Sequence, residues 1–184
     1  KIIPYHYDKY AQCPERYEMV TTNCLTGKAC YYEEKNNPQR IIDIVRASSS
    51  LPFVCPIAYV DGIPMLDGGI TDSIPLLRAQ NEGFTENHVV VLTRNRGYRK
   101  QIKGTKVPPF IYRKYPLLRE AINNRSKLYN EQLDLVERLE DEGRITVIRP
   151  QRPIEVNRIE KNIDKLTALY EEGYQLADGI RFEL

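Results

Sequence analysis

Hydrophobic and polar positions in the first part of the chain alternate between short strand patterns and a short helical pattern. Residues 17–34 predict a β-hairpin, because two runs of strand-forming residues flank a glycine turn. Asn37 and Pro38 predict a helix start, as the N-cap and the first helical residue. The expected buried face of this helix consists of Ile41, Ile42, Ile44 and Val45. We expect the helix to run out in Ser48-Ser49-Ser50, before Pro52.

A second hairpin follows directly. Two short strand patterns, residues 57–60 and 63–66, are joined by Asp61-Gly62, a dipeptide that strongly favours a hairpin turn. The second of these strands runs straight into Asp67-Gly68-Gly69. The sequence therefore predicts an acidic side chain at the end of an apolar strand, with two glycines behind it.

The next segment has the pattern of an α/β layer. A helix is predicted to begin near Pro75 and to end at Gly83, a residue typical of helix C-termini. Residues 88–93 form a continuous apolar run, which is typical of a central strand in a parallel sheet covered on both faces. We therefore assign residues 1–95 to the α/β fold class.

The character of the chain changes after Arg94. Residues 94–114 are basic and interrupted by proline and glycine, and a long helix is predicted over 116–142, ending at Gly143. One face of this helix is apolar, with Leu118, Ile122, Tyr129, Leu133 and Val136 at helical spacing.

A further strand near 145–149 and a final helical segment complete the pattern. The apolar positions of that last helix are Ile159, Ile163, Leu166, Tyr170 and Tyr174. We expect Gly173 to bend or divide it. Residues 96–184 are thus predicted to form a mainly helical C-terminal extension with one strand.

Composition narrows the class of protein. The 184 residues suffice for one core, or for one domain with a helical appendage. With 41% hydrophobic and 28% charged residues, the chain is neither disordered nor fibrous. The net charge of +2 gives no global field for nucleic acid or an anionic membrane, so we expect no nucleic-acid partner and only local membrane contact. No apolar run approaches the roughly 18–20 residues of a membrane helix.

The cysteines and the first residue bear on cofactor and location. Four cysteines without a C-x-x-C pair, and only two histidines, argue against a metal site. Reduced thiols are the simplest interpretation, which predicts a cytoplasmic location. Thiol nucleophiles at Cys24 or Cys55 are disfavoured because neither has an activating neighbour. Since the chain opens with Lys1 and not Met, we expect that the front of the protein was removed or lies outside this sequence.

Three segments, in this order, resemble the patatin-like phospholipase family: Arg46-Ala47-Ser48-Ser49-Ser50-Leu51-Pro52, Asp61-Gly62-Ile63-Pro64-Met65-Leu66-Asp67-Gly68-Gly69-Ile70 and Ile74-Pro75-Leu76. The hairpin over 20–27 is similar to the family's preceding strand pair. The resemblance covers about residues 17–95 and implies the second half of a three-layer α/β/α domain with a mostly parallel sheet. The helical tail, together with residues 94–99, looks like that of a bacterial subgroup with a C-terminal extension.

Asp67 is the residue to which this resemblance assigns chemistry. A partly desolvated carboxylate at the mouth of an α/β sheet can take the proton of a serine hydroxyl. The family uses such a Ser–Asp dyad without histidine, and His6 and His88 both lie outside the motif. Asp-Gly-Gly alone is usually a loop, so it is the flanking pattern that assigns Asp67 as general base, supported by Gly68 and Gly69. Ser73 replaces an Asn common in relatives, and we expect it to support the turn by hydrogen bonding.

The other half of the dyad is missing from this sequence. None of the ten glycines frames Gly-x-Ser-x-Gly or a Gly-rich oxyanion loop, and we interpret Ser48–Ser50 as a helix end. We expect the nucleophile in an N-terminal half outside this chain, carried by a separate chain or segment. These residues alone should then be inactive and aggregation-prone. The implied substrate is a lipid or other carboxylic ester, as in lipid degradation, with no cofactor.

Alternatives remain open. Arg94 and Arg96, with Arg99 and Lys100, could contact a phosphate or lipid head group at a membrane surface, although a solvated loop is the simpler interpretation. The second hypothesis for function is a non-catalytic α/β binding or regulatory domain that has lost the nucleophile. A third is a phosphate-handling enzyme that uses Asp67 with Arg94 and Arg96.

Overall fold

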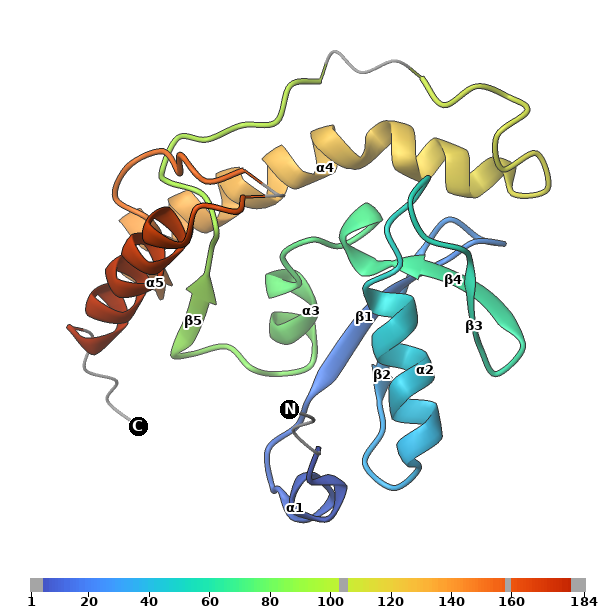
Figure 1. The fold of residues 1–184 in the computed structure, drawn as a ribbon, viewed down its shortest axis with the longest axis horizontal. Coiled ribbons are helices and arrows are strands. Elements are labelled where there is room, and N and C mark those ends of the chain that lie inside the picture. The colour runs from blue at the N-terminus through green and yellow to red at the C-terminus, as the bar shows by residue number, and fades with distance from the viewer. Residues whose placement is uncertain (1–4, 103–105, 158–159, 180–184) are drawn as a thin grey trace. The chain divides into compact units, whose positions relative to one another are not determined.

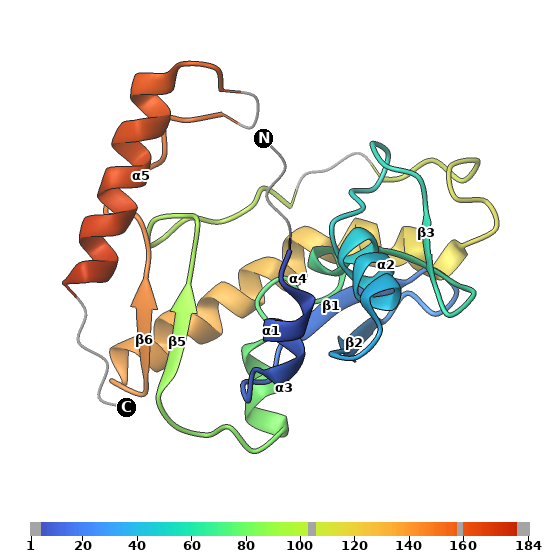
Figure 2. The same cartoon turned by 60° about the horizontal axis from the view of Figure 1, so that its bottom comes forward.

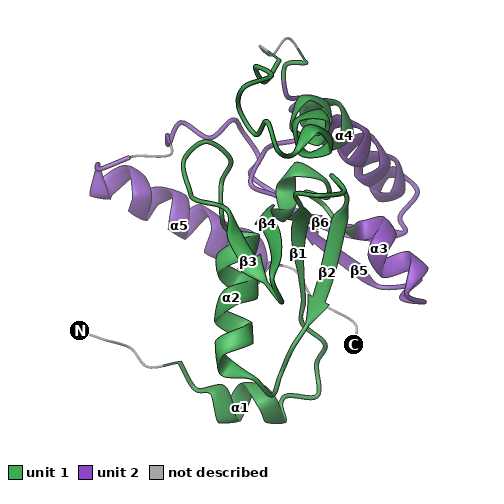
Figure 3. Cartoon of the chain, turned by 90° about the vertical axis from the view of Figure 1, so that its right-hand side faces the viewer, with its two compact units in different colours: residues 1–75, 101–129 green, residues 76–100, 130–184 purple. Residues whose placement is uncertain are grey.

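The computed structural model describes residues 5–102, 106–157 and 160–179 (Figure 1). The chain divides into two compact units, which consist of residues 1–75 with 101–129 and of residues 76–100 with 130–184 (Figure 3). Helix α4 (Pro116–Asp141) supplies residues to both units.

The first unit is built on a four-stranded sheet with the order β2-β1-β4-β3. Its strands are β1 (Glu18–Asn23), β2 (Ala29–Glu33), β3 (Ala58–Val60) and β4 (Ile63–Asp67). Both predicted hairpins are confirmed, β1–β2 and β3–β4, and β1 also pairs with β4 antiparallel. This sheet is antiparallel throughout, whereas we expected a mostly parallel one. The reason is local: a tight turn between two strands returns the chain in the opposite direction.

Helix α2 (Pro38–Ser48) starts as predicted, because the side chain of Asn37 accepts a hydrogen bond from the backbone N–H of Arg40 at 3.1 Å. Its buried residues are Ile41, Ile44 and Ala47. The expectation that Ile42 and Val45 are buried is wrong, since each is 46% exposed. Positions three apart stay on one side of a helix, so residues 41, 44 and 47 face the sheet while 42 and 45 are rotated away.

Helices cover both sides of β4. Met65 is buried in one apolar cluster with Ile44 and Ala47 of α2. The next residue, Leu66, is buried in a second cluster with Cys24, Ile70 and Leu118, the last of these on α4. Successive strand residues point to opposite faces, so α2 and the start of α4 pack on opposite faces of the sheet. Burial raises the pKa of the Cys24 thiol to about 12, which leaves this cysteine an unreactive core residue.

The second unit contains a parallel strand pair. Strand β5 (His88–Val91) pairs with β6 (Ile145–Ile148), and Figure 2 shows the two arrows running the same way. The expectation of a central strand covered on both faces is wrong within the described residues, because Val89 and Val91 are 43% and 69% exposed.

Two helices end just before the glycines that were expected to end them. Helix α3 (Leu76–Asn81) is followed by Gly83 with φ +92°, and α4 by Gly143 with φ +69°. A residue without a Cβ adopts this left-handed backbone at least cost. A short helix, α1 (Tyr7–Gln12), lies near the start of the chain.

The last helix differs from the prediction. Helix α5 (Ile163–Asp178) runs through Gly173 without interruption, so the expected division there is wrong. A glycine inside a helix costs only about 1 kcal/mol, which the neighbouring turns outweigh. Ile159, expected on its apolar face, lies outside the described residues. Across the described ranges, none of the helices has both the length and the apolar character needed to cross a membrane.

Candidate active site

Asp67 is the last residue of β4, and two other elements, the end of α2 and strand β1, hold its backbone. Its N–H donates a hydrogen bond to the carbonyl of Ser50, at the end of α2, at 2.9 Å. Its carbonyl accepts one from the hydroxyl of Thr22 on β1, also at 2.9 Å. In the β1–β4 register Asp67 lies opposite Thr21. The position of Asp67 therefore depends on tertiary structure and not on a flexible loop.

The carboxylate of Asp67 is half-buried, and its two oxygens have different surroundings. Oδ1 accepts a hydrogen bond from the backbone N–H of Gly69 at 2.7 Å and so caps the short 3-10 turn η1 (Gly68–Ile70). For Oδ2 there is no hydrogen-bond donor among the residues that the structure describes. One oxygen is fixed and the other is available, which is an arrangement suited to accepting a proton from an approaching hydroxyl group.

Close contacts surround both glycines of the motif, most severely at Gly68. A Cβ on Gly68 would lie 2.3 Å from the carbonyl oxygen of Val20, so only glycine lets η1 approach β1 this closely. A Cβ on Gly69 would lie 3.0 Å from Oδ1 of Asp67 and would crowd the capping carboxylate. Glycine at position 68 is thus a steric requirement of this turn, and position 69 leaves little room for a side chain.

Two side chains fix the turn by hydrogen-bonding the carbonyl of Gly69. The carbonyl of Gly69 accepts hydrogen bonds from the hydroxyl of Ser73 at 2.8 Å and from Nε of Arg125 at 2.7 Å. The supporting role predicted for Ser73 is confirmed. Arg125 was missed, because it lies on α4, 56 residues further along the chain. The available signal was a cation on the apolar face of that helix, seven residues after the buried Leu118.

The residues after the turn are tied to the first hairpin. The hydroxyl groups of Thr22 and Thr71 share a hydrogen bond of 2.8 Å, and the hydroxyl of Tyr31 donates to Oδ2 of Asp72 at 2.6 Å. These contacts extend the support of the turn from β1 to β2. The carboxylate of Asp72 serves as a structural acceptor, in contrast to that of Asp67.

The serine-rich segment ends helix α2, as predicted. Ser50 is buried and its hydroxyl donates to the carbonyl of Arg46 at 2.7 Å, while that of Ser49 donates to Val45 at 2.8 Å. Neither histidine hydrogen-bonds Asp67. His6 precedes α1, and His88 opens β5 in the second unit.

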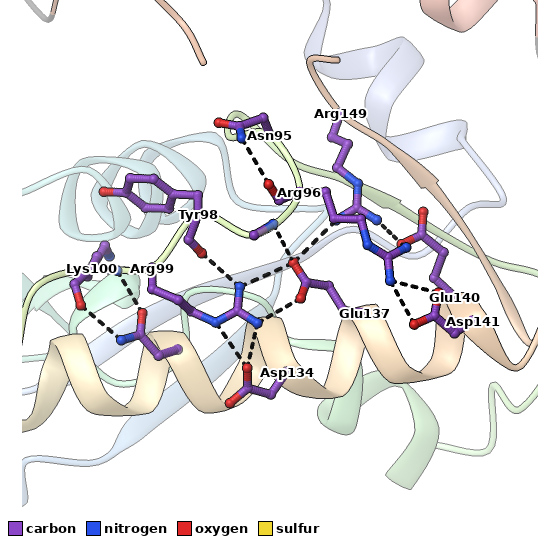
Figure 4. Close-up of polar contacts among 12 residues, drawn as sticks. Asn95, Arg96, Tyr98, Arg99, Lys100, Asp134, Glu137, Glu140, Asp141 and Arg149 are labelled. Carbon is purple, nitrogen blue, oxygen red and sulfur yellow. Dashed lines mark hydrogen bonds and ion pairs between the residues drawn. The ribbon is translucent and has the colours of Figure 1, made fainter. Parts of the chain in front are cut away.

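Arg94, Arg96, Arg99 and Lys100 lie in the second unit, where acidic residues of α4 pair with two of these arginines (Figure 4). Arg96 pairs with Asp141 at 2.7 Å and with Glu140 at 3.2 Å. Arg99 pairs with Asp134 at 2.6 Å and with Glu137 at 2.7 Å. The guanidinium of Arg94 instead lies over the ring of Tyr98, 4.9 Å from its centroid. Of the two arginines predicted to contact a phosphate, Arg96 is engaged in ion pairs.

Arg149 adds a third guanidinium to this network from the strand side (Figure 4). Only 7% of its side chain is exposed, and it pairs with Glu140 and, at 3.8 Å, with Glu137. Burial, together with the neighbouring charge of Arg96, lowers the pKa of Arg149. Removal of a carboxylate from this cluster would therefore leave a buried cation without its counter-charge.

We predict that Glu137 makes the second unit sensitive to acid. The hydrogen bond from Arg99, and a further one from the N–H of Gly97, lower the pKa of Glu137 from 4.5 to about 2. Because the folded state prefers the carboxylate, the contribution is present above pH 4.5 and lost as the pH falls from 4.5 towards 2. We expect this contribution to be about 1–2 kcal/mol, less than the pKa shift alone gives, because solvent screens Arg99.

The measurement is urea unfolding of Glu137→Gln and the wild type between pH 7 and pH 2, monitored by a signal that reports on the unfolding of the second unit. The variant should be less stable at neutral pH and lose less stability on acidification. Glu171→Gln on α5, where the carboxylate has no ion pair in the described structure, is the matched control and should behave as wild type. Equal acid profiles for Glu137→Gln and wild type would contradict the assignment.

Two parts of the chain match known families. Residues 26–79 match the model of the patatin-like phospholipases, and residues 115–180 match that of a domain of unknown function (DUF6363). No individual curated protein matches the chain. The first stretch contains the Asp67 turn and is similar to a family of lipid acyl hydrolases; the second contains Arg125. The hydrogen bond from Arg125 to Gly69 therefore joins the two matched stretches.

Proposed function

We propose that this chain supplies the general base of a serine lipid acyl hydrolase, and that Asp67 is this base. The observation that carries the proposal is the asymmetry of the carboxylate, in which Oδ1 is bound to Gly69 and Oδ2 has no donor among the described residues. The match of residues 26–79 to the patatin-like phospholipases supports it. The nucleophile would come from a segment outside this sequence, since no Gly-x-Ser-x-Gly occurs within it.

The proposed reaction proceeds through an acyl-enzyme. Asp67 accepts the proton of the serine hydroxyl as the serine oxygen attacks the ester carbonyl carbon. The same proton passes to the leaving alcohol when the carbon–oxygen bond breaks. Water then gives a proton to Asp67 and attacks the acyl carbon, and that proton returns to the serine oxygen as the fatty acid departs. This route requires no cofactor.

We further propose that the N-terminal half completes the fold. Added strands would turn the layers seen here into a larger, mostly parallel sheet and cover the exposed side of β5, where Val89 and Val91 lie. Residues 1–95 would then be the C-terminal part of the catalytic domain and residues 96–184 a mainly helical extension. That extension would hold the catalytic turn through Arg125.

The test is labelling of the intact protein, purified from its natural cells, with a fluorophosphonate probe that reacts with activated serines. We expect one labelled serine, mapped by mass spectrometry to a peptide outside these 184 residues. A label on Ser48, Ser49 or Ser50 would overturn the proposal that the nucleophile lies outside this sequence while its general base lies within it.

Complete absence of labelling would support a second candidate, a non-catalytic α/β binding or regulatory domain. The observation that favours this candidate is that the sequence contains no nucleophile motif. The phosphate-handling alternative has less support, because Arg96 is paired with Asp141 and Glu140.

A further inference from the structure

Two loops of the first unit meet in a strained pairing. They are the segment 51–56 between α2 and β3 and the segment 107–115 before α4 (Figure 1). The backbone N–H of Phe53 donates a hydrogen bond to the hydroxyl of Tyr112 at 2.9 Å, and the two rings lie 5.7 Å apart. Both residues have positive φ, +69° for Phe53 and +51° for Tyr112, which bulky side chains rarely adopt. Contacts that hold two strained residues together define the conformation of both loops.

This pairing presents large apolar side chains to solvent. Val54 is 78% exposed, Phe110 is 77% exposed and Phe53 is 58% exposed. Leu51 and Leu117, at 37% and 47%, border them in sequence. Apolar side chains that gather on two contacting loops are typical of a surface that binds something else.

The charged side chains within the two loops, Arg113 and Lys114, are both cations, and the nearest acids along the chain are Asp61 and Glu120, the latter close to Pro108 and Pro109. Residues 47–60 contain no charged side chain, and residues 106–119 contain four cations and no acid. The four are Lys106, Arg113, Lys114 and Arg119. Arg113 and Lys114 are exposed, while Arg119 braces the loop by donating a hydrogen bond to the carbonyl of Pro109 at 2.5 Å. Exposed aromatic and aliphatic groups beside cations have the chemistry that binds an anionic lipid interface.

Both loops are also attached to the elements that hold Asp67. The first follows Ser50, whose carbonyl binds the N–H of Asp67. The second leads into α4, which carries Arg125 to the carbonyl of Gly69. We propose that loops 51–56 and 107–115 form a docking surface for the anionic face of a lipid bilayer. A contribution of this surface to catalysis rests on the function proposed above, whereas binding of the surface to a membrane does not.

The test is co-sedimentation of the intact protein with phosphatidylcholine vesicles, with and without phosphatidylglycerol. We expect binding to the anionic vesicles that weakens as salt is added. Phe110→Ser should lower this binding about tenfold, because one aromatic side chain would no longer be buried in the bilayer when the protein binds. Arg113→Ala with Lys114→Ala should lower it about 25-fold, since each cation near the surface contributes about fivefold. Binding to neutral vesicles should change only with Phe110→Ser.

Matched controls come from the second unit. Ile163→Ser removes an equally exposed apolar side chain, and Lys161→Ala with Lys165→Ala removes the same charge; both should bind as wild type. No binding of the wild type to anionic vesicles, or equal binding by the loop variants, would overturn the proposal. It would also be overturned if the loop variants lowered the melting temperature while the controls did not, because the surface would then pack against another part of the protein. Hydrolysis of a soluble short-chain ester, measured in parallel, reports on the proposed function separately.

Discussion

In the intact protein, Asp67→Asn is expected to lower kcat for ester hydrolysis by about 10²- to 10⁴-fold, the usual contribution of a positioned general base. The amide oxygen of Asn can keep the hydrogen bond that Oδ1 now accepts from Gly69 at 2.7 Å. The second position, where Oδ2 has no donor in the described structure, would become an NH₂ group that cannot accept a proton. The substitution therefore separates the chemistry of Asp67 from its role as a cap.

The measurement is turnover of a soluble ester, together with thermal unfolding of the same preparation. Asp72→Asn is the matched control, because that carboxylate lies five residues further on and accepts a hydrogen bond from Tyr31 at 2.6 Å. We expect the control to keep near wild-type kcat and both variants to keep the wild-type melting temperature. An Asp67→Asn enzyme that retained a tenth or more of wild-type kcat would rule Asp67 out as general base.

Local signals in the sequence predicted local structure well. Asp61-Gly62 predicted the β3–β4 hairpin, Asn37 predicted the start of α2, and Gly143 predicted the end of α4. Each of these features depends on the backbone preferences of one or two residues, which a sequence shows directly. The role of Asp67 rests on more than one residue, since its assignment needs the family pattern around it.

Features that depend on distant residues were missed or misjudged. Residues 88–91 have the apolar pattern of a strand buried on both faces, and that pattern cannot show whether the covering elements belong to the same chain. The Arg125 clamp joins residues 56 positions apart. The ion pairs of Arg96 and Arg99 could more nearly have been predicted than the Arg125 clamp. Their partners Asp134, Glu137 and Asp141 recur on one face of α4, at a spacing that can receive a basic loop.

Gly68→Ala is expected to destabilise the first unit by about 3 kcal/mol, the upper range for inserting one methyl group into a packed site. The added Cβ would lie 2.3 Å from the carbonyl oxygen of Val20 and 2.5 Å from its carbonyl carbon, so a backbone must move. Val20 belongs to β1, which lies between β2 and β4 in the sheet and is hydrogen-bonded on both sides. A strand in that position cannot shift without breaking pairs with its neighbours, and η1 is fixed by the clamp on Gly69.

Gly62→Ala is the control within the same sheet. It has a positive φ of +77°, but an added Cβ there meets nothing within 4 Å. The control should therefore cost only the backbone strain of about 1–2 kcal/mol. Urea unfolding of the intact protein gives both values, and ester turnover should fall in Gly68→Ala alone, because a displaced η1 moves Asp67. If the two alanines cost the same, the close contact between Gly68 and β1 does not stabilise the fold, and the steric account of the Asp-Gly-Gly turn fails.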